Sequence, residues 1–213
     1  MDFAMSYSFG KDSAYALYKM IKDGHKPVCL ITTINEDNKK SWTHGVNSTI
    51  IEKYIKSLGL PMILAPCNSN NYETAFEEAL QKAKNLGANS CVFGDIDIEL
   101  HFEWNRSRCK NTLLECIMPL YGIKREKIIQ EELDTGFVAI IKCVEKKFLG
   151  IEFLGKTLDK ELLDKIKKTG ADVCGENGEY HTLVIDGPIF KESIEVEIGE
   201  IIDLGNYASI DIH

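Results

Sequence analysis

The chain has 213 residues, of which 44% are hydrophobic and 27% charged, and its formal net charge is -8 at pH 7. This composition is typical of a globular protein with a sizeable core, and the acidic balance gives no electrostatic reason to bind DNA or an anionic membrane. No apolar run approaches the ~20 residues that a membrane-spanning helix needs, and the N-terminus lacks the basic and apolar regions of an export signal.

Seven cysteines are scattered through the chain, and none forms a CxxC pair. An odd number of cysteines, several within apolar runs, is typical of buried reduced thiols. The missing CxxC argues against a zinc ribbon or a thioredoxin-like redox pair. We therefore expect a cytoplasmic protein without disulfides.

The first hundred residues alternate between short apolar runs and helical periodicity. We expect strands at residues 3–7, 28–34, 62–65 and 90–93, and helices with apolar faces at residues 14–21, 51–58 and 76–83. Such alternation predicts βαβ units and a parallel sheet with helices on both faces. Ligands of such sheets bind beyond the carboxyl ends of the strands.

The pattern changes near residue 122, where a smaller C-terminal α+β lobe is expected. Its predicted elements are strands at residues 139–144, 183–185, 194–198 and 200–204, and a helix at residues 158–166 that ends before Gly170. The chain then divides into a domain of residues 1–121 and a lobe of residues 122–213, packed closely because no long linker joins them.

The segment SFGKDS, residues 8–13, lies between the first predicted strand and helix. It is not a Walker A loop, because Met5 stands where the first glycine belongs and Asp12 follows the lysine. Gly10 allows close approach of a ligand or a positive φ, and the helix N-terminus, capped by Asp12 or Ser13, favours an anion. An aspartate beside phosphate implies a bridging magnesium ion at Asp12. A plain strand-to-helix turn is the alternative.

A second cluster lies in the segment GENGEYHT, where Glu176, Glu179 and His181 fall within six positions. Two carboxylates and an imidazole on a glycine-rich loop can hold a metal ion, an ammonium ion or a proton in transit. A solvated turn is the alternative here.

The SFGKDS segment resembles the SGGKDS signature of PP-loop ATP pyrophosphatases, which have a Rossmann-like fold of the adenine-nucleotide α-hydrolase type. Phe9 departs from that signature, because it replaces a glycine. In that superfamily the loop grips the β- and γ-phosphates of ATP while a nucleophile attacks the α-phosphate.

Together the two segments closely resemble the diphthine–ammonia ligase family, which carries a PP-loop at its start and a G-E-x-G-E-[FY]-x-T segment near its end. Intermediate matches are Gly94-Asp95-Ile96, Trp104, Cys109, Gly155-Lys156 and Pro119-Leu120-Tyr121, where the family usually has Pro-Leu-Trp. The resemblance implies that a carboxylate attacks ATP to give an acyl-adenylate and pyrophosphate, after which ammonia displaces AMP. In the family, the product is the diphthamide of elongation factor two.

The resemblance also implies roles for individual residues. Catalysis falls to Lys11, Asp12, Glu176, Glu179 and His181, and Asp12 is the expected magnesium ligand. The ATP site is expected to include Ser8, Gly10, Lys11, Asp12, Ser13, Thr32, Gly94 and Asp95. His44 is a candidate contact of the acceptor substrate, because the family tends to have a histidine in its loop. Trp104 and Arg106 follow the fourth predicted strand and could line the cleft and meet the adenylate or an acidic substrate; a charged helix surface is the alternative. Free ammonium is the expected nitrogen donor, because no glutaminase-like domain is present.

Other functions stay open on the sequence alone. A bacterial relative would amidate a different carboxylate, and the GENGEYHT form suits one. A sulfurtransferase would use the same loop to adenylate a tRNA base, with Cys174 as the candidate sulfur carrier. A nucleotide-binding protein without catalysis is a further alternative. The chain could also form a homo-oligomer.

Overall fold

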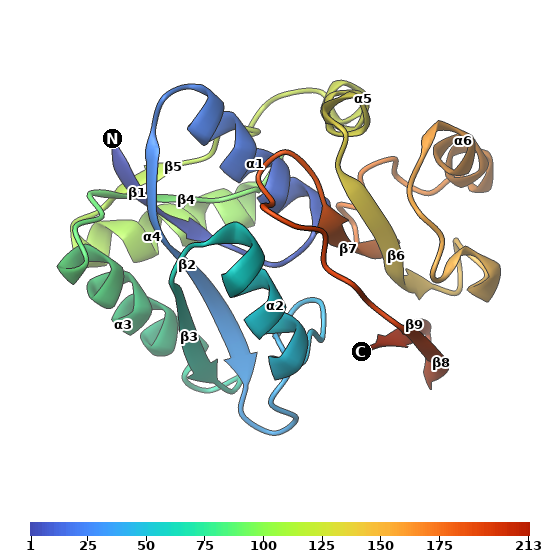
Figure 1. Cartoon of the computed structure of the whole chain (residues 1–213), viewed down its shortest axis with the longest axis horizontal. Coiled ribbons are helices and arrows are strands. Elements are labelled where there is room, and N and C mark those ends of the chain that lie inside the picture. The colour runs from blue at the N-terminus through green and yellow to red at the C-terminus, as the bar shows by residue number, and fades with distance from the viewer.

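The computed structural model describes residues 1–213 and contains two β-sheets (Figure 1). The first sheet is parallel, with the strand order β3-β2-β1-β4-β5. Its elements, in chain order, are β1 (Asp2–Ser6), α1 (Lys11–Lys22), β2 (Lys26–Asn35), α2 (Ser48–Leu58), β3 (Met62–Cys67), α3 (Tyr72–Asn85), β4 (Ser90–Val92), α4 (Glu99–Thr112) and β5 (Glu115–Ile117). The predicted α/β fold with a parallel sheet is confirmed.

Helices cover both faces of this sheet. Apolar side chains of α1 and α2, such as Leu17 and Ile51, belong to one core cluster, whereas Phe76 of α3 and Cys109 of α4 belong to another. The apolar periodicity predicted α1, α2 and α3 but gave no signal for α4, whose sequence is largely polar and whose buried residues include Asn105.

The second sheet is antiparallel, with the order β7-β6-β9-β8. It is built from β6 (Val138–Glu145), β7 (Tyr180–Asp186), β8 (Ile198–Leu204) and β9 (Tyr207–Ile212), accompanied by α5 (Arg125–Thr135), the short 3-10 helix η1 (Ile151–Phe153) and α6 (Lys160–Thr169). The predicted strand at residues 194–198 is wrong. Ile194 is buried in a loop, where its N–H donates to the carbonyl of Ile185, and the strand begins only at Ile198.

One continuous core joins the two sheets. It includes Leu17 and Ile50 from the helices on the parallel sheet together with Ile141 and Leu183 from the antiparallel sheet. Figure 1 shows the α1 and α2 face of the parallel sheet turned toward β6 and β7. The first turn of α1 is therefore placed against β7, which brings the two predicted clusters together.

Seven free cysteines are present, of which Cys116 and Cys143 are half-buried and the others buried. None of the helices is both long and apolar enough to cross a bilayer.

Candidate active site

A cleft of about 580 Å³ lies between the carboxyl end of the parallel sheet and the start of β7. Residues of SFGKDS and of GENGEYHT line the same cleft, although more than 160 positions of chain separate them. The lining includes Ser8, Lys11, Asp12, Ser13, Gly94 and Asp95, which follow strands of the parallel sheet, and Gly175, Glu176, Gly178, Tyr180, His181 and Thr182 from the C-terminal half of the chain.

The SFGKDS loop, residues 8–13, has the shape of a strand-to-helix turn. The positive φ that a glycine was expected to supply falls on Phe9, at 72°, while Gly10 has a φ of -82° and is the residue before α1. Gly10 is required for space instead, because a Cβ there would lie 2.3 Å from the ring carbon Cε1 of His44. Phe9 is fully buried against Tyr7 and Tyr54, whose ring centroids lie 5.4 and 4.8 Å from its own. This packing stabilises the unfavourable backbone conformation of Phe9.

The first turn of α1 leaves backbone donors unpaired toward the cleft. The N–H of Lys11 donates to Oγ1 of Thr182 over 3.1 Å, but no residue accepts from the N–H groups of Asp12 and Ser13. Gly94 packs on this turn, and a Cβ there would lie 2.9 Å from the backbone nitrogen of Ser13. Free N–H groups at a helix start favour an anion. The expectation that Asp12 or Ser13 caps the helix is wrong. The helix α1 already begins at Lys11, and the Ser13 hydroxyl donates to the carbonyl of Gly10.

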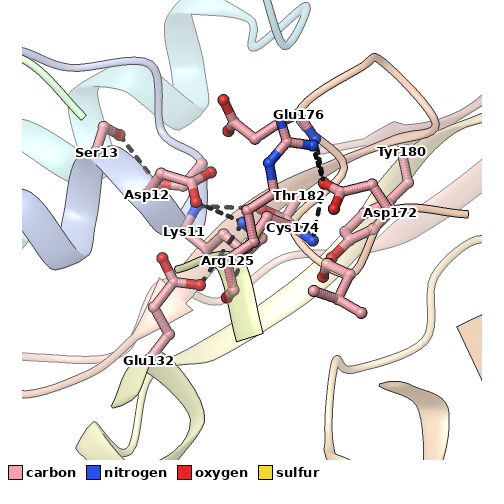
Figure 2. A network of polar contacts seen from close by, with 12 residues as sticks. Lys11, Asp12, Ser13, Arg125, Glu132, Asp172, Cys174, Glu176, Tyr180 and Thr182 are labelled. Carbon is pink, nitrogen blue, oxygen red and sulfur yellow. Dashed lines mark hydrogen bonds and ion pairs between the residues drawn. The ribbon is translucent and has the colours of Figure 1, made fainter. Parts of the chain in front are cut away.

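Lys11 lines the cleft, but its side chain is nearly fully buried, with 3% of it exposed. Its Nζ lies 2.5 Å from Oδ1 of Asp12 and 3.6 Å from Oε2 of Glu132, as Figure 2 shows. Burial lowers the pKa of Lys11, but Asp12 and Glu132 outweigh it, so the net pKa is raised and the ammonium stays charged. Burial raises the pKa of Glu132, whose carboxylate oxygens have no hydrogen-bond partner.

The two glutamates of the acidic loop, residues 172–179, have different surroundings and oppositely shifted pKa values. Glu179 is buried and does not line the cleft, because its carboxylate accepts from the backbone N–H groups of Asp172 and Asn177 and from the side-chain amide of Asn177. Burial raises the pKa of Glu179, but these hydrogen bonds outweigh it and lower the pKa overall. Glu176 lines the cleft, and its pKa is raised to about 7, first by burial and then by Asp12.

Two histidines meet on the wall of the cleft. The rings of His44 and His181 lie 5.2 Å apart, and Nδ1 of His44 is 2.6 Å from the carbonyl oxygen of Thr182, to which it donates. Burial lowers the pKa of His44 to about 3, aided by His181, and burial also lowers the pKa of His181. Both rings are therefore neutral at pH 7.

The remaining predicted residues are divided between the cleft and its surroundings. Asp95 and Trp104 line the cleft. Arg106 does not; its guanidinium lies 5.3 Å from the ring centroid of Phe102. Thr32 is buried and donates to the carbonyl of Tyr7, beside a smaller cavity of about 60 Å³ that adjoins the cleft.

Several cleft residues carried little or no signal in the sequence. Tyr72 and Phe76 of α3 pack with Trp104 as an aromatic wall, with ring centroids 5.8 and 5.2 Å from that of Trp104. Thr182, which lines the cleft, and Glu132, which does not, contact the SFGKDS loop from the C-terminal half of the chain. Thr182 belongs to the GENGEYHT segment and could have been found there, but nothing in the sequence around Glu132 separates it from Glu126 and Glu131 of the same helix.

The side chains fit a magnesium ion only in part. No group of three or more histidine, cysteine or acidic side chains could hold a metal ion by itself. Asp12 presents one carboxylate at the cleft, beside unpaired backbone N–H groups that suit phosphate. One carboxylate completed by phosphate oxygens and water is the usual setting of Mg²⁺, so these residues fit a magnesium–nucleotide complex rather than a free ion.

Comparison with known protein families gives matches over both halves of the chain. The N-terminal domain model of diphthamide synthase matches residues 1–115, and the C-terminal domain model matches residues 124–212. The chain belongs to the diphthamide synthase family. The expected family is thereby confirmed, and with it the assignment of the chain as a ligase-class enzyme.

Individual relatives agree with the family. The chain is 28% identical to the diphthine–ammonia ligase of Rattus norvegicus and 27% identical to that of Homo sapiens, in each case over 95% of this chain and 85% of the relative. The diphthine–ammonia ligase of Schizosaccharomyces pombe is 28% identical over 92% of this chain but only 36% of its own length. A solved structure described as a predicted subunit of tRNA methyltransferase from Methanocaldococcus jannaschii aligns over 91% of this chain and 100% of its own, with 18% identity and a TM-score of 0.48.

Proposed function

We propose that this member of the diphthamide synthase family is an AMP-forming amide ligase that adenylates a carboxylate with ATP and transfers ammonia to it. The observation that carries the proposal is that one cleft combines the unpaired N–H groups of Asp12 and Ser13 with the carboxylate of Glu176. The first feature suits a polyphosphate and the second suits an ammonium ion or its proton.

In the first half-reaction, an oxygen of the acceptor carboxylate attacks the α-phosphate of ATP, and pyrophosphate leaves. The N–H groups at the start of α1 stabilise the leaving charge, and the buried ammonium of Lys11 adds a positive field. Asp12 is the residue that would hold Mg²⁺, which supplies Lewis-acid stabilisation to the phosphates when bound. Ser8, Gly10 and Ser13 shape the loop, and Gly94 and Asp95 stand next to it.

In the second half-reaction, ammonia attacks the carbonyl carbon of the acyl-adenylate, and AMP leaves. Ammonia is mostly ammonium at neutral pH, as other amines are. Glu176 is the carboxylate placed to bind that cation, whereas Glu179 holds the acidic loop in shape and His181 stands on the wall with His44. Holding three reactants in one cleft contributes up to about 7–11 kcal/mol through orientation.

The acceptor is proposed to be diphthine on elongation factor two, by analogy with the named relatives. The aromatic wall of Tyr72, Phe76 and Trp104 would meet the acceptor or the adenine of ATP. A different small-molecule or protein carboxylate is the second candidate for the acceptor.

Product analysis tests the proposal. The protein is incubated with ATP, Mg²⁺, ammonium and a panel of carboxylates that includes diphthine-modified elongation factor two. AMP and pyrophosphate should form only with acceptor and ammonium, and the Asp12→Ala and Lys11→Ala variants should lose this turnover. Formation of ADP and phosphate, or tight binding of ATP without turnover, would instead favour a kinase-like or nucleotide-sensing protein.

A further inference from the structure

A histidine–aspartate pair lies at the cleft on the side of α4. Nδ1 of His101 is 3.0 Å from Oδ1 of Asp95, and the side-chain amide of Asn105 donates to the other oxygen, Oδ2, over 2.8 Å. All three residues line the cleft. Asn105 is buried, so the Asp95 carboxylate is fixed at both oxygens by residues from one face of α4.

The arrangement leaves the other ring nitrogen of His101 available. The His101 side chain is 55% exposed, and its Nε2 has no hydrogen-bond partner in the chain. A carboxylate on Nδ1 fixes the tautomer of the ring and makes Nε2 the proton acceptor, which is how a histidine is arranged as a general base.

Neither of the other cleft histidines has this arrangement. Nδ1 of His44 faces a backbone carbonyl, and no carboxylate pairs with the ring of His181, which packs against His44. The hydrogen bond with Asp95 raises the pKa of His101, although burial opposes it, and Glu176 adds a smaller contribution in the same direction. Glu176, the ammonium-binding carboxylate of the proposed mechanism, lines the same cleft as His101.

We propose that His101 is the base that takes the proton from ammonium in the second half-reaction, with Asp95 and Asn105 as its positioning residues; this rests on the proposed ligase function. One N–H bond of the ammonium ion breaks, and its proton passes to Nε2 of His101. The freed electron pair forms the C–N bond at the acyl-adenylate carbonyl, and the C–O bond to AMP breaks with its electron pair leaving on AMP. The second excess proton on nitrogen passes to water.

The two half-reactions can be measured separately with the full-length chain. Exchange of labelled pyrophosphate into ATP, dependent on diphthine-modified elongation factor two, reports the adenylation step. Amide formation with ammonium chloride and hydroxamate formation with hydroxylamine report the second step. Hydroxylamine is uncharged at neutral pH, so it needs no base to remove a proton before it attacks.

The His101→Gln variant should lose amide formation with ammonium by about 100-fold or more, the usual contribution of a general base. Hydroxamate formation should fall much less, and the pyrophosphate exchange rate should stay close to that of the wild type. The rate with ammonium in the variant should recover as the pH is raised and free ammonia accumulates. Asp95→Asn should give a smaller loss with the same selectivity for ammonium. His25→Gln is the matched control, because the ring of His25 lies 3.2 Å from the N-terminal amine and does not line the cleft.

Equal losses with ammonium and hydroxylamine would overturn the inference, because His101 would then position the acceptor rather than move a proton. An unchanged rate with ammonium would overturn it as well. If the wild-type protein shows no acceptor-dependent exchange at all, the proposed function itself fails, and this result is distinguishable from a selective defect of the His101 variant.

Discussion

The two loops that form the cleft use polar groups in opposite ways. In the SFGKDS loop the charged side chain of Lys11 is buried and paired, while backbone N–H groups face the cleft unpaired. In the acidic loop, backbone N–H groups donate to the carboxylates of Glu179 and Asp172 within the loop, and the side chain of Glu176 faces the cleft. A loop suited to an anion therefore exposes its backbone, whereas a loop suited to a cation exposes a carboxylate.

The same comparison separates residues that read alike in the sequence. Glu176 and Glu179 are three positions apart, yet burial raises the pKa of the first to about 7 and hydrogen bonds lower the pKa of the second. The structure brings a hydrogen-bonded carboxylate that stabilises the loop close to a poorly solvated carboxylate that lines the cleft. Four predictions would break or sharpen this contrast.

The largest effect is expected for Asp12→Asn, which removes the carboxylate that the SFGKDS loop presents to the cleft. We expect at least a 1,000-fold loss of pyrophosphate formation, about 4 kcal/mol in transition-state stabilisation, because the proposed Mg²⁺ ligand is weakened. Asp23→Asn, at the other end of α1, is the control. Activity within tenfold of the wild type would show that the loop works through its backbone alone.

Phe9→Gly tests why a bulky residue occupies a positive φ in the same loop. Loss of a fully buried ring costs about 3–5 kcal/mol, and relief of the backbone strain returns about 1 kcal/mol. We expect the free energy of unfolding to fall by about 2–4 kcal/mol, as measured by urea denaturation. Phe9→Ala should be less stable than Phe9→Gly, since alanine keeps the strain; the reverse order would show that the backbone is not strained at this position.

In the acidic loop, Glu179→Gln should lower the free energy of unfolding by about 2–3 kcal/mol, because hydrogen bonds to a charged acceptor are lost. Glu176→Gln should not lower it at neutral pH, since no N–H of the chain donates to the Glu176 carboxylate and its burial disfavours the charge. Thermal or urea unfolding of the matched pair measures the difference. Equal destabilisation by the two variants would remove the distinction drawn between the two glutamates.

The smallest effect concerns the pH dependence of stability. Because the pKa of Glu176 is higher in the folded protein, about 7, than its ordinary 4.5, the folded state holds the proton longer. The protonated Glu176 therefore adds to the free energy of unfolding; this addition is complete below pH 4.5 and is lost as the pH rises through 7. The free energy of unfolding of Glu176→Gln, relative to that of the wild type, should therefore rise by about 1–2 kcal/mol between pH 4.5 and pH 8. A difference that stays constant with pH would place Glu176 in water.

Local patterns were sufficient for most of the parallel sheet and for the two motifs. The apolar periodicity of α1, α2 and α3 and the β-branched run of β2 each record a buried face directly. The apolar periodicity did not predict the helix α4, because this helix packs through Trp104, Asn105 and Cys109 rather than through an aliphatic stripe. The sequence pattern did not predict the register of β8 and β9, because β8 is an exposed edge strand without an alternating pattern.

The sequence by itself determined the α/β class, the family and the two segments that carry chemistry, because each depends on residues that are close neighbours in the chain. Only the tertiary structure decided which side chains of those segments face the cleft. Glu132 pairs with Lys11 and both side chains are buried, hydrogen bonds within the acidic loop hold Glu179 outside the cleft lining, and α4 brings His101 to Asp95. Burial and hydrogen bonding across distant parts of the chain set these orientations and protonation states, and no local pattern records them.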